Sequence, residues 1–213
     1  MLAIRSVYVI DDDFDVRTSI SFMLASDDLE ATTFGGGEGL LAALPDLEPG
    51  CILLDVRMPK MDGFEVMAVL RKRAIDWPII VMTGHGEVPV AVRAMKNGAI
   101  DFIEKPFGED VLAASLERGF ALLDERNSKD QHRRSARERI AMLSAREREV
   151  LQGLLGGMPN KLVADRLGIS LRTVEMHRAN MMDRLRVKSL AEALTLAVQS
   201  DLPILDADKN EQD

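Results

Sequence analysis

Four residues in the first half of the chain have types and positions suited to phosphoryl chemistry. Asp11 and Asp12 follow one short apolar run, Asp55 follows another, and Lys105 follows a third. Clustered carboxylates repel one another unless a cation joins them, and a set of oxygen ligands suits a hard ion such as Mg²⁺. Such a centre can draw in a phosphoryl group, whose transfer depends mostly on positioning and charge neutralisation. In this scheme Asp55 is the nucleophile.

Alternating strand and helix patterns place these residues at one edge of a sheet. Strands are expected at residues 7–10, 31–34, 52–54, 79–82 and 102–103. Helices are expected near residues 16–25, 39–44, 64–73, 88–97 and 110–123. Strict alternation predicts an α/β domain with a doubly wound five-stranded parallel sheet, in which ligands bind beyond the carboxyl ends of the strands. The three carboxylates and the lysine would then share one pocket.

Each part of this pattern also has an ordinary structural interpretation. Asp11 and Asp12 can belong to a helix cap with solvated acids, and Lys105 by itself can be a surface lysine. Magnesium-dependent phosphohydrolases also use clustered aspartates, but Arg57 stands where such an enzyme would hold a second catalytic aspartate, two residues after Asp55. The combination of residues, more than any one of them, therefore favours a phosphoryl-accepting domain.

Residues 1–124 resemble the receiver domain of response regulators. Four motifs carry the resemblance, in this order along the chain: Asp11-Asp12, Asp55-Val56-Arg57-Met58-Pro59, Met82-Thr83-Gly84 and Lys105-Pro106. The resemblance implies a flavodoxin-like fold in which Asp55 is phosphorylated. It also implies that Mg²⁺ is bound by Asp11, Asp12, Asp55 and the backbone carbonyl of Arg57.

The same resemblance implies how phosphorylation is transmitted. Thr83 would hydrogen-bond the phosphoryl group, and Lys105 would pair with its oxygens. Phe102 would swing inward when Thr83 shifts, although a single aromatic at this position can also be a plain core residue. Gly84 would leave the phosphoryl site open to a donor. The Lys105-Pro106 peptide resembles a cis peptide of the family, whereas an X-Pro bond considered alone favours trans.

Charge and composition separate the rest of the chain into further parts. Residues 1–124 carry 21 acidic and 11 basic side chains, whereas residues 142–200 carry 6 acidic and 9 basic ones. Residues 125–141 are mostly charged or polar and contain neither Pro nor Gly, so we expect a helical linker. Residues 201–213, with 5 acidic and 1 basic side chain, are expected to form an acidic tail that frays.

Several features favour a cytoplasmic protein with no membrane contact. No apolar run approaches the roughly 18 residues needed to span a bilayer. Acidic residues begin at position 11, too soon for the hydrophobic region of a signal peptide. The single cysteine, Cys51, lies in an apolar run, where it fits a buried position in a reducing compartment.

Only helical patterns follow in residues 142–200, which predicts an all-α four-helix domain. Ser144 and Glu147 have the spacing of a capping box, Asn160 and Ser170 are expected to cap the next two helices, and a fourth helix is expected to start near Ser189. The runs 143–151, 160–164 and 168–178 resemble the LuxR-type helix-turn-helix. With a receiver in front of it, the whole chain resembles the FixJ-type members of the NarL/FixJ subfamily.

This second resemblance implies a recognition helix in the major groove of DNA. The family's base-reading positions fall on Glu175, Met176, Ala179 and Asn180. Phosphate contacts are expected from Lys161, Arg172, Thr173, His177 and Arg178. The alternative is a helical protein-interaction domain with a solvated charged face. The order of caps and turns favours DNA binding.

Taken together, the two resemblances imply a phosphorylation-dependent transcriptional regulator that has no separate enzymatic substrate. They imply a sensor histidine kinase as the phosphoryl donor, promoter DNA and RNA polymerase as partners, and a homodimer of the phosphorylated form. The receiver dimer interface is expected at Val88, Val92, Met95 and Lys96. The output dimer interface is expected at Leu190 and Leu194.

Overall fold

The chain folds into two compact units, Met1–Arg126 and Asn127–Asp213. A computed structural model describes residues 5–25, 29–84 and 88–205. The division between the units falls inside the expected linker, residues 125–141. Residues 206–213 of the expected acidic tail lie outside the described part of the chain.

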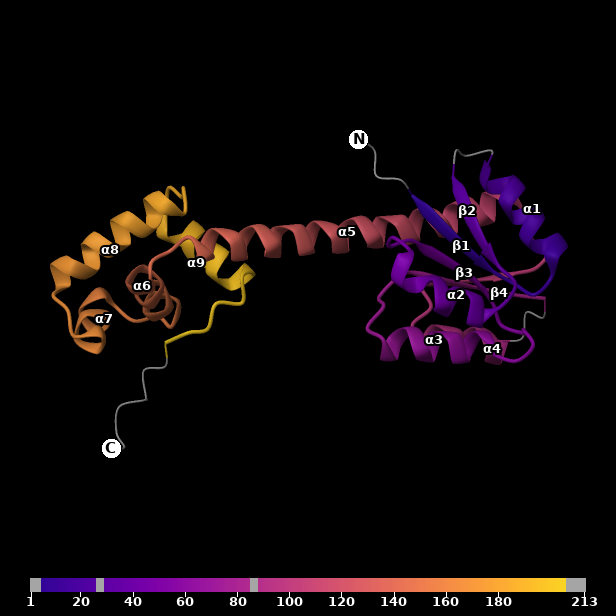
Figure 1. Ribbon diagram of the computed structural model, residues 1–213, viewed down its shortest axis with the longest axis horizontal. Helices are drawn as coiled ribbons and strands as arrows, with labels where there is room; N and C mark the ends of the chain where they lie inside the picture. Colours follow the sequence, from indigo (N-terminus) through magenta and orange to yellow (C-terminus); the bar gives the residue numbers. More distant parts are fainter. Residues whose placement is uncertain (1–4, 26–28, 85–87, 206–213) are drawn as a thin grey trace, which may run out of the picture. The chain divides into compact units, whose positions relative to one another are not determined.

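The first unit is built on a five-stranded parallel sheet (Figure 1). Its strands are β1 (Ser6–Ile10), β2 (Glu30–Phe34), β3 (Cys51–Asp55), β4 (Ile79–Thr83) and β5 (Asp101–Glu104). Their order in the sheet is β2-β1-β3-β4-β5, as expected for a doubly wound domain. Strands β3 and β4 are buried along their whole length because helices cover both faces of the sheet. The predicted fold class is therefore confirmed.

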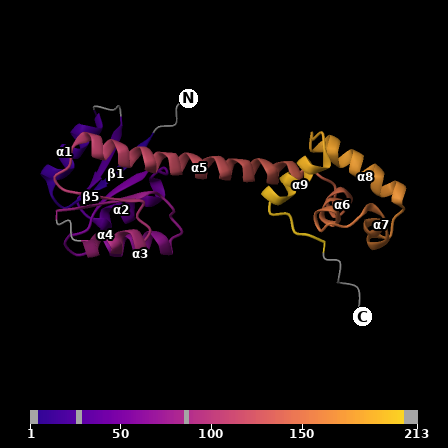
Figure 2. The same cartoon turned by 180° about the vertical axis from the view of Figure 1, so that it is seen from behind.

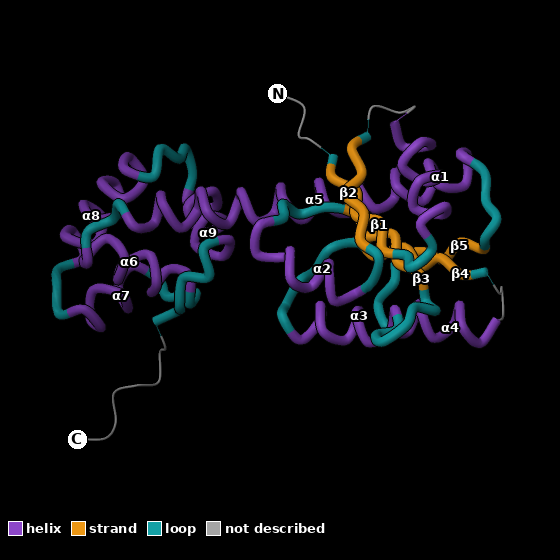
Figure 3. The backbone as a smooth tube through the Cα atoms, turned by 45° about the vertical axis from the view of Figure 1, so that its right-hand side comes forward, coloured by secondary structure: helices purple, strands orange, loops and turns teal. Residues whose placement is uncertain are grey.

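Helices lie on both faces of the sheet (Figure 3), and an apolar cluster between the sheet and the helices on each face forms the core of this unit. One cluster lies under α2 (Gly37–Ala43), α3 (Gly63–Lys72) and α4 (Val88–Lys96). The other lies under α1 (Phe14–Ala25) and the beginning of α5 (Glu109–Ala141). A short 3-10 helix, Leu44–Asp46, follows α2. The sheet is thus covered on both faces, and only its edges and strand ends are left for binding.

Helix α5 is longer than predicted, because the helix predicted at residues 110–123 and the helical linker are one continuous element. Its first turns contribute Leu112, Leu116 and Phe120 to the core of the first unit. Its last turns contribute Ala136 and Ile140 to the core of the second unit. None of the described helices combines the length and the apolar character that crossing a membrane requires.

The described part of the second unit contains four further helices (Figure 2). They are α6 (Ala145–Leu155), α7 (Asn160–Leu167), α8 (Leu171–Arg184) and α9 (Leu190–Gln199). The side chains of Ser144, Ser170 and Ser189 accept backbone hydrogen bonds at the starts of α6, α8 and α9, as predicted. Gly168 ends α7 in the left-handed conformation, with φ 64°, and makes the tight turn into α8.

The cap predicted at Asn160 is wrong. The N-cap of α7 is Pro159, no side chain caps this helix, and Asn160 is its first helical residue. The Oδ1 atom of Asn160 instead accepts a hydrogen bond from Nη1 of Arg178, at 2.8 Å. A contact with another helix therefore takes the acceptor that a cap would have used.

Candidate functional site

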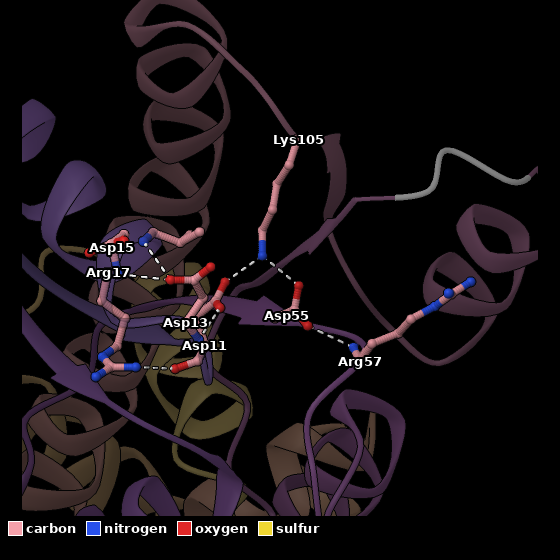
Figure 4. Close-up of polar contacts among 8 residues, drawn as sticks. Asp11, Asp13, Asp15, Arg17, Asp55, Arg57 and Lys105 are labelled. Carbon is pink, nitrogen blue, oxygen red and sulfur yellow. Dashed lines mark hydrogen bonds and ion pairs between the residues drawn. The ribbon is translucent and has the colours of Figure 1, made fainter.

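Asp11, Asp55 and Lys105 meet at the carboxyl edge of the sheet (Figure 4). The Nζ atom of Lys105 donates to Oδ1 of Asp55 at 2.6 Å and also to Oδ2 of Asp11. Asp11 is 1% exposed and Asp55 is 6% exposed, so both carboxylates are almost completely removed from water. These residues follow or end β1, β3 and β5, whose carboxyl ends share one edge because the strands are parallel.

The loop after β3 holds Asp55 from its other side. The backbone N–H of Arg57 donates to Oδ2 of Asp55 at 2.7 Å, so both carboxylate oxygens are engaged. Helix α3 begins against the Asp55 backbone at Gly63, where a Cβ atom would lie 2.4 Å from the Asp55 carbonyl oxygen. The capping box of Asp62 and Glu65 fixes this start of α3. Asp55 is therefore held in one orientation by elements on both sides.

The three aspartates after β1, Asp11 to Asp13, differ in burial and in hydrogen bonding. Asp11 is buried, its Oδ1 atom accepts from the Asp13 N–H at 3.0 Å, and its carbonyl accepts from Nη1 of Arg17 at 2.7 Å. Asp13 accepts from the Asp15 N–H at 2.8 Å, at the beginning of α1 (Figure 4). Asp12 is exposed.

The predicted cluster of three carboxylates is only partly assembled. Among residues 5–25, 29–84 and 88–205, no group of three His, Cys, Asp or Glu side chains is arranged to hold a metal ion. Asp11 and Asp55 come together, but Asp12 does not join them. The ammonium of Lys105 already neutralises part of the buried charge, whereas a third carboxylate is more stable in water.

Burial and charge both shift the ionisation of this pocket. Burial raises the pKa of Asp55 above its ordinary value; Lys105 opposes this shift, and the neighbouring Asp11 adds to it. Burial alone would lower the pKa of Lys105, but its hydrogen bonds and charge interactions with Asp11 and Asp55 outweigh burial and raise it. Two buried carboxylates face one ammonium, which leaves the pocket with an excess of negative charge. That excess suits an additional cation.

The residues expected to respond to phosphorylation lie next to this pocket. Thr83 ends β4, is 1% exposed, and accepts from the Lys105 N–H through its carbonyl at 2.8 Å. No atom of the described residues would lie within 4 Å of a Cβ atom added at Gly84, so none of them fills the space beside Thr83. Phe102 is half-buried in β5 and packs against the cluster under α2, α3 and α4. The Lys105-Pro106 peptide is cis, as the resemblance implied.

Helix α8 presents the predicted base-reading residues on one exposed face. Val174 and Met181 are buried and fix the opposite face against the second unit's core. Positions that recur every three or four residues share one face of a helix. Arg172, Glu175, Met176, Ala179 and Asn180 are exposed and share this spacing.

The residues predicted to bind phosphates differ in their surroundings. Lys161 is exposed in the first turn of α7, while Thr173, His177 and Arg178 are half-buried. The Thr173 hydroxyl lies 2.7 Å from the Ser170 hydroxyl, so it takes part in the cap of α8. Lys161 and Arg172 are therefore the more accessible cations of this set.

Comparison with known proteins decides the family. Residues 7–117 match the family described as response regulator receiver domain, and residues 141–197 match bacterial regulatory proteins of the luxR family. The chain belongs to the response regulators. A receiver domain implies a sensor kinase as partner, and a LuxR-type domain implies DNA binding.

Several named response regulators and transcriptional regulators are similar to this chain over both of its domains. The transcriptional regulatory protein FixJ of Bradyrhizobium diazoefficiens is 42% identical over 196 residues, which cover 92% of this chain and 96% of FixJ. The crystal structure of full-length FixJ from B. japonicum is 42% identical, covers 92% of this chain and 97% of that one, and has a TM-score of 0.57. The response regulator StyR is 38% identical, covers 92% and 100%, and has a TM-score of 0.79. The predicted FixJ-like combination of domains is confirmed.

The two predicted dimer interfaces differ in accessibility. On α4 of the receiver, Val88, Val92 and Met95 are 73%, 46% and 50% exposed, and Lys96 is also exposed. On α9, Leu190 and Leu194 are half-buried and pack against the two clusters of their own domain. The α4 residues are thus available to a partner, whereas the two α9 leucines mainly hold their domain together.

Some residues that shape the two sites were not singled out by the sequence. Arg17 and Gly63 hold the backbone around Asp11 and Asp55, and no local motif announces either role. Glu147 was recognised only by its capping-box spacing. It is 2% exposed, accepts from the Ser144 N–H at 2.9 Å and lies 3.4 Å from Nε of Arg184, which belongs to α8.

Proposed function

We propose that this protein is a phosphorylation-dependent transcriptional regulator in which Asp55 accepts a phosphoryl group from a sensor histidine kinase. The observation that carries the proposal is the buried contact of Asp55 with Lys105, at the carboxyl edge of a receiver sheet. Asp55 is held by Lys105 and Arg57, so its carboxylate is oriented before a donor arrives. The receiver assists its own phosphorylation and has no separate substrate.

The oxygen donors near Asp55 suit a Mg²⁺ ion in kind, and Asp12 would have to turn toward Asp11 and Asp55 to join them. The carboxylates of Asp11, Asp12 and Asp55 and the carbonyl of Arg57 would hold it, and all of these donors are oxygens, which a hard cation prefers. The pocket supports this assignment, since Lys105 neutralises only one of the two buried carboxylates and Asp12 adds a further negative charge. When bound, Mg²⁺ would neutralise charge on the phosphoryl group.

Phosphorylation would rearrange the contacts of Lys105. It adds about −1.5 to −2 units of charge, in a pocket where one ammonium is now shared by Asp11 and Asp55. The new oxygens would compete for that ammonium and would accept a hydrogen bond from Thr83. A shift of Thr83, which ends β4, would let half-buried Phe102 move in the neighbouring strand. The surface formed by α4 and β5 would change as a result.

That changed surface would pair two receivers through Val88, Val92, Met95 and Lys96, and the dimer would bind promoter DNA in the cytoplasm. Two recognition helices would then lie about 34–36 Å apart, on successive major grooves. Glu175, Met176, Ala179 and Asn180 would read bases. RNA polymerase is the proposed downstream partner. On α9, the exposed Val198 is better placed for a second dimer contact than Leu190 and Leu194.

Genome-wide binding with and without phosphorylation of Asp55 tests this function. We expect a limited set of promoter fragments to be enriched by the phosphorylated chain and lost with Asp55→Asn. Enrichment of protein partners with no DNA would instead favour the interaction-domain alternative.

A further inference from the structure

Asn160 and Arg178 join two helices of the DNA-binding domain through a hydrogen bond. Nη1 of Arg178, on α8, donates to Oδ1 of Asn160, the first residue of α7, at 2.8 Å. Both residues are half-buried. The start of α7 does not use the Asn160 side chain as a cap. The bond is therefore a tertiary contact, and its acceptor is the residue next to Lys161.

We infer that Asn160 is a positioning residue that holds the Arg178 guanidinium ready to bind a DNA phosphate; this inference rests on the proposed function. A guanidinium has five N–H donors in a rigid, planar fork, and a phosphate pairs best with two of them at once. Asn160 engages the group at Nη1 and leaves the edge formed by Nε and Nη2 for the phosphate.

Arg172 offers a comparison on the same helix. It is exposed, and among the described residues it makes no hydrogen bond or ion pair. DNA would have to immobilise the Arg172 side chain itself, which costs part of the binding energy. Arg178 has already lost much of this freedom in the unbound protein. The two arginines should therefore respond differently to the loss of Asn160.

The size of the effect follows from the cost of immobilising one long side chain. That cost, converted to affinity, corresponds to roughly 2- to 12-fold. Asn160→Ala should therefore weaken DNA binding by about this factor. It removes no charge, so the dependence of affinity on salt should stay unchanged. Arg178→Ala removes a cation and should reduce the salt slope by about one.

The experiment is a double-mutant cycle on the full-length, phosphorylated chain. The probe is a DNA duplex that the wild-type chain has selected from a random-sequence library, and the measurement is fluorescence anisotropy at several salt concentrations. One cycle combines Asn160→Ala with Arg178→Ala. The control cycle combines Asn160→Ala with Arg172→Ala.

We expect Asn160→Ala to have no further effect when Arg178 is already alanine, and its full effect when Arg172 is alanine. Equal weakening in both backgrounds would mean that Asn160 acts independently of Arg178 and would overturn the inference. Absence of any weakening would also overturn it.

Arg178→Gln separates phosphate binding from a purely structural link between α7 and α8. Glutamine can still donate to Asn160 but carries no charge, so we expect its binding to be as weak as that of Arg178→Ala. Wild-type binding by Arg178→Gln would overturn the inference. If the wild-type chain itself selects no duplex, the proposed function fails, whereas binding by the wild type with an additive cycle removes only the role of Asn160.

Discussion

Lys105→Met tests the electrostatic balance of the phosphorylation pocket. Methionine keeps an unbranched side chain of similar length, but it removes the ammonium that Asp11 and Asp55 share. Two carboxylates with exposed side-chain fractions of 2% and 8% would then face each other without a cation. We expect the receiver to lose stability in the absence of divalent cations.

Two estimates bound the size of this loss. Removal of one partner from a buried ion pair costs about 3–5 kcal/mol. The cost cannot greatly exceed that of protonating Asp55, which at pH 7 and from an ordinary pKa of 3.8 is about 4 kcal/mol. The Lys105 side chain is 18% exposed, so water reduces its contribution. The expected destabilisation is therefore about 3 kcal/mol.

The dependence on pH has a definite sign. Burial already raises the pKa of Asp55, and loss of Lys105 would raise it further. A carboxylate whose pKa is higher in the folded state destabilises the protein fully above that pKa, and this destabilisation declines to zero as pH falls to the ordinary pKa of the unfolded chain. The difference between Lys105→Met and wild type should be full at neutral pH and should shrink as pH falls through the raised pKa.

Fluorescence of Trp77 during urea unfolding provides the assay. Trp77 is the single tryptophan of the chain and stacks on Tyr8 in the receiver, with ring centroids 5.3 Å apart, so it reports on that domain. Lys72→Met, at an exposed position, is the control and should change the free energy of unfolding by less than about 0.5 kcal/mol. Mg²⁺ should stabilise Lys105→Met more than wild type, since the lysine no longer competes with it. Equal free energies of unfolding for Lys105→Met and wild type in the presence of a chelator would refute this reasoning.

Further substitutions test the backbone and the output domain. Gly63→Ala places a Cβ atom 2.4 Å from the Asp55 carbonyl oxygen; the same fluorescence assay should show a loss of about 1–3 kcal/mol, and an unchanged urea midpoint would contradict it. Lys161→Ala should weaken binding to every duplex and reduce the salt slope by about one; a change confined to one base position would count against a phosphate contact. Glu147→Ala removes the acceptor for the Ser144 N–H and should cost about 1–2 kcal/mol in thermal unfolding of the second unit, followed by circular dichroism; no loss would show that the capping box adds nothing.

Elements and contacts that depend on nearby residues could be predicted from the sequence. The strand Cys51–Asp55 could be predicted from an apolar run that ends in an aspartate. A central parallel strand is buried on both faces, so its residues are apolar without alternation. Ser144, Ser170 and Ser189 were predictable as caps because each bonds to a backbone N–H three residues later. The helical linker was predictable from its lack of Pro and Gly, although its fusion with the preceding helix was not.

Contacts between distant residues could not be predicted in the same way. The hydrogen bond between Lys105 and Asp11 joins residues 94 positions apart, and the sheet topology predicted only that they would be near each other. Asn160 looked like a cap because local spacing does not show that Arg178, on another helix, would use its side chain. Leu190 was expected at a dimer interface, but it packs against the core of its own domain, a contact that local sequence does not show.

The most direct test of the central claim compares wild type with Asp55→Asn in DNA binding before and after treatment with a phosphoryl donor. Asparagine keeps the shape of the side chain but cannot form the acyl phosphate. We predict that phosphorylation tightens binding of the wild-type chain to its selected duplex and promotes dimer formation, while Asp55→Asn shows neither response. A phosphorylation-dependent gain in DNA affinity that survives Asp55→Asn would contradict the assignment of Asp55 as the input of the switch.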